Sequence, residues 1–132
     1  KELTDNEKLS NNLVSVVTKD KKEEILQLIY FDFDKTNLSE VSIRWIKEFI
    51  IKYNKKIEKY LIVGHTDSKG SKQYNMNLSL ERANAVKKVF IHNGINENRI
   101  KIIGMGESNL RIKTEDEVPH PANRRAEITP LN

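Results

Sequence analysis

The alternation of short apolar runs with longer segments of helical periodicity most strongly limits the folds open to this chain. Residues 24–31 and 60–65 have the composition of buried strands, residues 99–105 are a further strand candidate, and residues 125–129 are a last short one. Between them lie two segments with the apolar periodicity of amphipathic helices. This order predicts an α/β fold (an α+β sandwich), a β-α-β-α-β-β mixed sheet with helices packed on one face. The strand–helix–strand units are expected to be parallel, and the last strand to return antiparallel at an edge.

The first predicted helix follows Ser39, a residue type well suited to cap a helix N-terminus. Apolar residues recur along it at steps of three and four, which predicts that Trp45 lies in the core. The stripe consists of Val41, Trp45, Ile46, Phe49, Ile50 and Tyr53.

A long polar loop is predicted over residues 66–77, and loops of this length often carry function. A second helix should follow, capped by Ser79 and ended by Asn93 and Gly94, because glycine suits the left-handed conformation after a helix. Its inward face is predicted to carry Ala83, Val86 and Phe90.

The chain has 132 residues, which fits a single domain with one core. We expect residues 1–12 to be a polar linker or N-terminal extension and residues 13–132 to form the domain. Residues 13–18 are also strand-like, and the charged residues 19–22 would join them to the next strand as an exposed hairpin. The sequence begins at Lys1 and contains no apolar run of about 20 residues. We therefore expect targeting and anchoring segments upstream.

Composition excludes several kinds of site. The absence of cysteine removes disulfides, thiol catalysis and zinc–thiolate centres. His65, His92 and His120 are too widely spaced for a metal-ligand motif, so we predict no metal and no cofactor. The net charge of +4 could suit nucleic acid, but lysines alternate with acids, as in residues 19–24. This pattern favours a solvated surface, and we predict no nucleic-acid partner.

Asp67 and Arg82 form the candidate binding pair. Asp67 follows a predicted strand, and Arg82 lies in the first turn of the predicted second helix. A cation there opposes the helix dipole at a cost of about 0.3–1 kcal/mol, so an anion should offset it. Two interpretations remain open. Either Asp67 forms a salt bridge to Arg82, or the two residues clamp the ammonium and the carboxylate of a zwitterionic amino acid.

Short motifs surround this pair in a fixed order. They are VGHTDSKG at 63–70, YN at 74–75, LSLERA at 78–83, FDFD at 31–34, IGMGE at 103–107 and NRRAEI at 123–128. Over roughly residues 29–129 the pattern resembles the OmpA-like peptidoglycan-binding domain, a family that includes peptidoglycan-associated lipoproteins and the periplasmic part of flagellar stator proteins.

The resemblance implies a non-enzymatic module that binds peptidoglycan without a covalent bond and anchors an envelope protein to the cell wall. Asp67 and Arg82 match the pair that binds meso-diaminopimelate in the stem peptide. The ligand-binding residues implied are Phe33, Asp34, Thr66, Asp67, Asn75, Leu78, Arg82 and Arg125, with Arg124 as the alternative to Arg125. Structural alternatives remain for several of them: Phe33 and Leu78 as core, Asn75 as a loop stabiliser, and the arginines as ion-pair partners.

The resemblance also implies a location. The module is expected in the periplasm, tethered to the outer membrane, or to the inner membrane if it is of the stator type. A dimer is one oligomeric state left open. Residues 111–122 depart from the alanine- and glycine-rich sequence common in the family, so the neighbouring rim is expected to differ.

Other functional classes fit less well. Residues 32–36 resemble the first motif of haloacid-dehalogenase-type phosphatases, with Asp32 as nucleophile and Asp34 as acid/base. That chemistry needs further acids to hold magnesium, and the only aspartates after Asp34 are Asp67 and Asp116. A serine hydrolase would need a relay that residues 65–68 are too close in sequence to form. An adaptor with an unused pocket is the third alternative, against which the intact pair of Asp67 and Arg82 argues.

Overall fold

The computed structural model describes residues 13–17 and 23–131, which form a five-stranded sheet and two long helices. The strands are β1 (Leu13–Val17), β2 (Glu23–Tyr30), β3 (Tyr60–Gly64), β4 (Ile100–Gly104) and β5 (Arg125–Pro130). The helices are α2 (Glu40–Tyr53) and α3 (Lys72–His92), with short 3₁₀ turns η1 (Glu97–Arg99) and η2 (Pro121–Asn123). The predicted linker at 1–12 and hairpin connection at 19–22 lie outside the described residues.

The sheet has the order β1-β2-β5-β3-β4. β3 and β4 are parallel, whereas β5 runs antiparallel to both β2 and β3. The predicted mixed sheet is confirmed, and β1 adds one strand to the six-element order. The edge position predicted for the last strand is wrong, because β5 lies inside the sheet. Its Ala126 and Ile128 are fully buried, as suits a strand paired on both sides.

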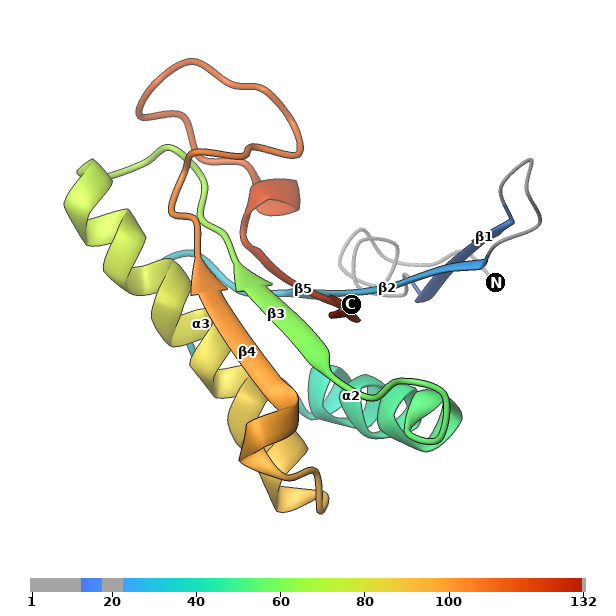
Figure 1. Cartoon of the computed structure of the whole chain (residues 1–132). Coiled ribbons are helices and arrows are strands. Elements are labelled where there is room, and N and C mark those ends of the chain that lie inside the picture. Colours follow the sequence, from blue (N-terminus) through green and yellow to red (C-terminus); the bar gives the residue numbers. More distant parts are fainter. Residues whose placement is uncertain (1–12, 18–22, 132) are drawn as a thin grey trace.

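Both helices pack on one face of the sheet, as predicted (Figure 1). Their buried side chains meet those of the strands in a single core formed by Ile29, Phe31, Ile46, Phe49, Ile50, Tyr53, Ile57, Tyr60, Ile62, Ala83, Val86, Phe90, Ile95, Ala126 and Ile128. Full burial of one large aliphatic side chain contributes about 1.5–3 kcal/mol. Trp45 lies at the margin of this core and is only partly buried, and Val41 is exposed. In the described part of the chain, neither helix is apolar enough over a sufficient length to cross a bilayer.

The start of α3 differs from the prediction. The helix begins at Lys72, and Ser71 caps it by accepting a hydrogen bond from the amide of Tyr74. Ser79, the predicted cap, is buried in the middle of the helix. Its hydroxyl accepts a 2.8 Å hydrogen bond from the amide of Gly106. Helix α3 therefore starts eight residues earlier than predicted and takes up much of the expected loop.

Glycines allow α3 to lie directly against β3 and β4. A Cβ atom on Gly64 would stand 1.7 Å from the carbonyl oxygen of Ser79. A Cβ on Gly104 would stand 2.8 Å from the hydroxyl oxygen of the same serine. This close contact brings the first half of α3 beside the end of β3, where the connection from β4 to β5 also lies (Figure 1).

Candidate ligand-binding site

An open pocket of about 240 Å³ lies where these segments meet, past the carboxyl end of β3. Its wall is formed by Phe33, Asp34, Thr66, Asp67, Lys69, Gly70, Tyr74, Asn75, Leu78, Arg82, Glu117 and Arg124. Drug-sized ligands usually occupy about 300–1,000 Å³. The pocket therefore suits a smaller ligand, on the scale of one amino acid.

The pocket brings together most of the residues that the sequence singled out. Seven of the eight line it, namely Phe33, Asp34, Thr66, Asp67, Asn75, Leu78 and Arg82. Arg125 does not. Its buried side chain donates a 2.6 Å hydrogen bond to Glu127, and its neighbour Arg124 lines the pocket instead. Adjacent residues at the start of a strand point in opposite directions, which explains why only one arginine of the pair reaches the site.

Arg82 is completely buried, and main-chain carbonyls hold its guanidinium. Nε donates to the carbonyl of Lys35 at 2.9 Å, Nη1 to that of His65 at 3.0 Å and Nη2 to that of Asp32 at 3.1 Å. The guanidinium also stacks over the ring of Phe31, 5.2 Å from its centroid. Because Arg82 lies ten residues after the start of α3, the predicted placement in the first helical turn is wrong, and so is the dipole argument that depended on it.

Three bonds do not exhaust the donors of Arg82. A guanidinium has five N–H groups, so one on each terminal nitrogen has no hydrogen-bond partner among the described residues. Burial lowers the pKa of Arg82 to about 10, while the negative charge of Asp67 opposes this shift. The side chain therefore stays cationic at neutral pH and keeps two donors for an anion.

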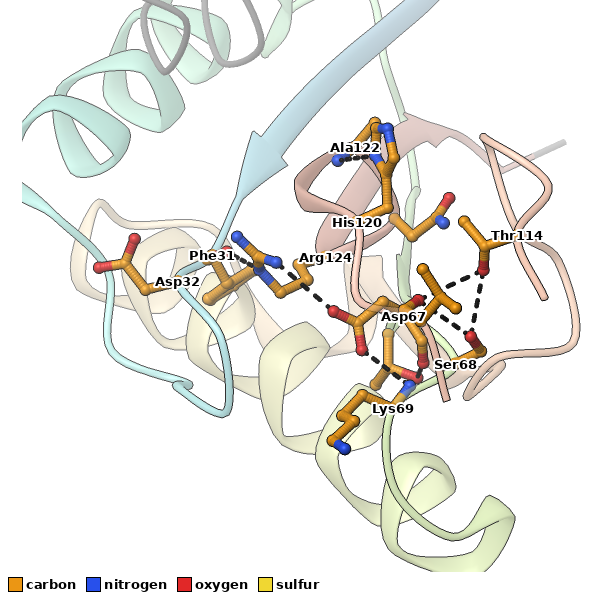
Figure 2. Close-up of polar contacts among 12 residues, drawn as sticks. Phe31, Asp32, Asp67, Ser68, Lys69, Thr114, His120, Ala122 and Arg124 are labelled. Carbon is orange, nitrogen blue, oxygen red and sulfur yellow. Dashed lines mark hydrogen bonds and ion pairs between the residues drawn. The ribbon is translucent and has the colours of Figure 1, made fainter. Parts of the chain in front are cut away.

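Asp67 is also buried, with 3% of its surface exposed. One carboxylate oxygen accepts a 3.2 Å hydrogen bond from the amide of Lys69, and the other lies 3.4 Å from Nη1 of Arg124 (Figure 2). Asp67 and Arg82 form no salt bridge with each other. Of the two interpretations left open by the sequence, the salt bridge between loop and helix is therefore wrong, and Arg124 is the ion-pair partner of Asp67. The contact is long for a charge-assisted hydrogen bond, which typically measures about 2.7–2.9 Å.

The other predicted residues divide between rim and support. Asn75 is buried, and its side-chain amide donates to the carbonyl of Asp67 at 3.3 Å and of Lys69 at 3.0 Å, which matches its alternative role as a loop stabiliser. Leu78 is 8% exposed and lines the pocket. Phe33 is 48% exposed, so it lies on the rim and not in the core.

The acids of the phosphatase-like motif have other roles here. Asp32 contributes its carbonyl to Arg82, and the carboxylate of Asp34 accepts a hydrogen bond from the hydroxyl of Tyr74. This hydrogen bond raises the pKa of Tyr74. Within residues 13–17 and 23–131, no three histidine, aspartate or glutamate side chains gather closely enough to hold a metal ion.

Sequence reasoning missed several pocket residues. They are Lys69, Gly70, Tyr74 and Glu117. Arg124, which the sequence offered only as the alternative to Arg125, also lines the pocket. With them the wall carries three acids, Asp34, Asp67 and Glu117, and three bases, Lys69, Arg82 and Arg124. Such a balance suits a ligand with charges of both signs. Tyr74 lies within a motif noted in the sequence, whereas no local pattern marks Glu117.

Known proteins resemble this chain over most of its length. It is 37% identical over 101 residues to outer membrane protein A of Bordetella avium, a match covering 75% of the chain and 52% of that protein. It is 26% identical over 99 residues to the peptidoglycan-associated lipoprotein of Pseudomonas aeruginosa, covering 75% and 59%. The chain thus spans between about three tenths and two thirds of the length of the curated relatives it matches.

Solved structures share the fold. The crystal structure of the peptidoglycan-associated lipoprotein from Burkholderia pseudomallei has a TM-score of 0.65 and 25% identity, over 77% of this chain and 87% of that one. The cell wall anchor of the T6SS from Pseudomonas aeruginosa has a TM-score of 0.68 at 19% identity, over 84% of each chain, and shows the fold alone. The names of these relatives refer to the outer membrane and to peptidoglycan, and they are not names of enzymes. Residues 30–124 match the family model described as the OmpA family, and the chain therefore belongs to the OmpA family.

Proposed function

We propose that this chain binds peptidoglycan non-covalently through the pocket and so anchors an envelope protein to the cell wall. Membership of the OmpA family supports this, as do relatives named peptidoglycan-associated lipoprotein. The observation that carries most weight is the common pocket of Asp67 and Arg82, residues of opposite charge from the β3–α3 loop and from α3 itself.

The proposed ligand group is the zwitterionic end of meso-diaminopimelate in the stem peptide. Its ammonium would lie against the carboxylate of Asp67, displacing the long contact with Arg124. Its carboxylate would accept the two remaining N–H groups of Arg82 in a bidentate pair. Because three main-chain carbonyls already fix the guanidinium, little side-chain entropy would be lost on binding.

A single site of this size should bind weakly. Few ligand atoms fit the pocket, so we expect a dissociation constant on the order of micromolar to millimolar for the free amino acid. The cell wall presents many stem peptides, and a tethered module meets them at high effective concentration. The proposed role is therefore a mechanical link built from weak contacts.

The proposed location is the periplasm, next to the wall. We propose a tether to the outer membrane, as in relatives named outer membrane protein A and porin F, or to the inner membrane if the parent protein is of the stator type. The parent protein could act as a monomer or a dimer, and the site described above lies within one chain.

Retention on purified peptidoglycan sacculi tests the proposal. The wild type should sediment with sacculi, whereas Asp67→Asn and Arg82→Lys should lose most of the bound fraction. Asp116→Asn provides a matched control, because Asp116 is exposed and does not line the pocket. Thermal unfolding of each variant identifies losses that are due to misfolding. Equal retention of Asp67→Asn and wild type would contradict the proposal.

Competition identifies the ligand group. Free meso-diaminopimelate should release the protein from sacculi at lower concentration than a lysine whose α-amino and α-carboxyl groups are blocked as in a peptide, because that side chain ends in an ammonium and has no carboxylate to pair with Arg82. Equal potency of the two would refute diaminopimelate as the specific group. Failure of the wild type itself to bind sacculi would instead favour the adaptor alternative with an unused pocket.

A further inference from the structure

The loop that carries Asp67 is tied to a distant part of the chain through Ser68. This serine is 2% exposed, and its hydroxyl lies 3.1 Å from the hydroxyl of Thr114, 2.9 Å from the carbonyl of Glu115 and 3.1 Å from the carbonyl of Val118 (Figure 2). A hydroxyl has one hydrogen, so Ser68 donates to only one of these groups at a time, and either hydroxyl can be the donor in the bond between Ser68 and Thr114. The residue next to Asp67 is thus enclosed by the 114–118 segment.

Glu117 makes two further links to the same loop. Its amide donates a 3.1 Å hydrogen bond to the carbonyl of Ser68. One of its carboxylate oxygens accepts a 2.7 Å hydrogen bond from the amide of Gly70. These contacts lie on either side of Lys69, whose own amide binds the carboxylate of Asp67. Glu117 therefore braces the turn that aims Asp67 into the pocket.

The backbone of Glu117 is held in an unfavourable conformation. Its φ of 65° lies in the left-handed region, which residues with a side chain rarely occupy. The residue is exposed, so burial of its side chain does not explain the strain. Strained residues persist where surrounding contacts determine them, and they gather at functional sites. Here the hydrogen bonds to Ser68 and Gly70 are the contacts that hold the residue in place.

The second half of the long connection from β4 to β5 is closed by a buried side chain. Asn123 is completely buried, and its side-chain amide both accepts from the amide of Ile112 and donates to the carbonyl of Ile112, at 2.8 Å each. This pair of bonds brings residues 112 and 123 together, so residues 113–122 project from a closed base. This closure places Glu117 next to the β3–α3 loop.

We propose that Glu117 is a positioning residue of the binding site, which holds residues 66–70 in the conformation that presents Asp67 to the ligand. This inference rests on the proposed function and adds to it a second segment of chain, residues 114–118, that controls affinity without contributing the charged pair. The part of Glu117 that matters is its acceptor oxygen, not its charge, because the partner is a main-chain amide.

Three variants separate the acceptor from the charge. Glu117→Gln keeps an oxygen that can accept from Gly70, whereas Glu117→Ala removes it. Glu115→Ala is the matched control, because it deletes a carboxylate from the same loop while leaving the main-chain carbonyl that faces Ser68. We expect Glu117→Ala to weaken binding to sacculi about tenfold, and Glu117→Gln and Glu115→Ala to remain within about twofold of wild type.

Amide hydrogen exchange supplies a readout that a general loss of stability would not reproduce. The amide of Gly70 should exchange faster in Glu117→Ala than in Glu117→Gln, while amides in the middle of β3 stay equally protected in both. Wild-type binding by Glu117→Ala, or unchanged exchange at Gly70, would overturn the inference. An equal loss of binding in Glu117→Gln and Glu117→Ala would also overturn it, because it would assign the effect to charge.

The two proposals fail in different ways. If Asp67→Asn loses binding while Glu117→Ala binds normally, the pocket function stands and the positioning role falls. If Asp67→Asn binds sacculi as well as the wild type does, the pocket function itself falls, and the positioning role falls with it.

Discussion

Nη1 of Arg82 donates a 3.0 Å hydrogen bond to the main-chain carbonyl of His65, two residues before Asp67. Arg82 and Asp67 are therefore linked through the backbone and not by a direct ion pair. This arrangement sets the position of each residue while leaving part of the guanidinium for an anion. It also makes Arg82 a structural residue, whose loss affects stability as well as binding.

Replacement of Arg82 should destabilise the fold. Arg82→Ala leaves the carbonyls of Asp32, Lys35 and His65 without their donor, and we expect the free energy of unfolding to fall by about 2–4 kcal/mol. Arg82→Lys should lower the free energy of unfolding by less, because the lysine ammonium keeps the positive charge, although it lacks the planar fork of the guanidinium. Urea unfolding at neutral pH measures both. An unchanged unfolding midpoint for Arg82→Ala would show that these bonds contribute nothing net.

The adjacent arginines should behave differently from each other. Arg125 is buried and bonded to Glu127 and to the carbonyl of Asn109, so Arg125→Met should lower the free energy of unfolding by about 2–4 kcal/mol. Arg124 is more exposed and its contact with Asp67 is long, so Arg124→Met should cost about 1 kcal/mol or less. Denaturant titrations of the two variants, run side by side, check this. The reverse ranking would contradict the placement of the two side chains.

Gly64 and Gly94 provide a matched test of close packing. Gly64→Ala places a methyl group 1.7 Å from the carbonyl oxygen of Ser79, which α3 cannot relieve without leaving the sheet. We expect a loss of about 3 kcal/mol or more. Around Gly94 an added Cβ meets no atom within 4 Å, so Gly94→Ala should cost only the strain of its φ of 87°, about 1 kcal/mol. Thermal unfolding distinguishes the two, and equal losses would argue against the clash.

Glu127 should make the fold sensitive to acid. Burial alone would raise its pKa, but interactions with His65 and Arg125 lower the pKa to about 2, from an ordinary value of 4.5. A carboxylate with a depressed pKa stabilises the folded state above its unfolded pKa, and that stabilisation is lost as pH falls from 4.5 towards 2. The stability difference between wild type and Glu127→Gln should therefore be largest near neutral pH and shrink across this interval.

Urea unfolding of the wild type and of Glu127→Gln, from neutral pH down to about pH 2, gives this difference directly. The other carboxylates are present in both proteins, so their contributions to the pH dependence of stability largely cancel in the difference. A difference that stays constant across the interval would show that Glu127 does not carry the effect.

Segments with strong periodicity were predictable from sequence, and segments defined by distant contacts were not. The core positions Ala83, Val86 and Phe90 follow from their spacing, and all three are fully buried. The start of α3 was misplaced because asparagine and serine favour loops and caps when considered alone. Here Ser79 is bonded to Gly106, a partner 27 residues away that no local pattern indicates.

The candidate site shows the same division. The motifs located Asp67 and Arg82, but they did not indicate that both are buried or that Arg124 bridges Asp67 and the carbonyl of Phe31. Which of Arg124 and Arg125 faces the pocket depends on the register of β5 in the sheet. A shift of one residue would exchange the directions of the two side chains. Glu117 lies at the pocket because hydrogen bonds between Asn123 and Ile112 close the loop that carries it. These two residues are 11 positions apart, so no local sequence pattern indicates the contact.

The interior position of β5 has a consequence for how this domain assembles. β2 and β3 share no hydrogen bonds with each other, and both pair with β5. Until residues 125–130 emerge during synthesis, the two halves of the sheet have no common ladder, and Ile29 and Ile62 lack the strand that joins their surfaces. Assembly must therefore wait for the C-terminal strand, which favours a late, cooperative transition over stepwise folding from the N-terminus. Premature termination before residue 125 should yield chains that remain open and accessible to chaperones and proteases.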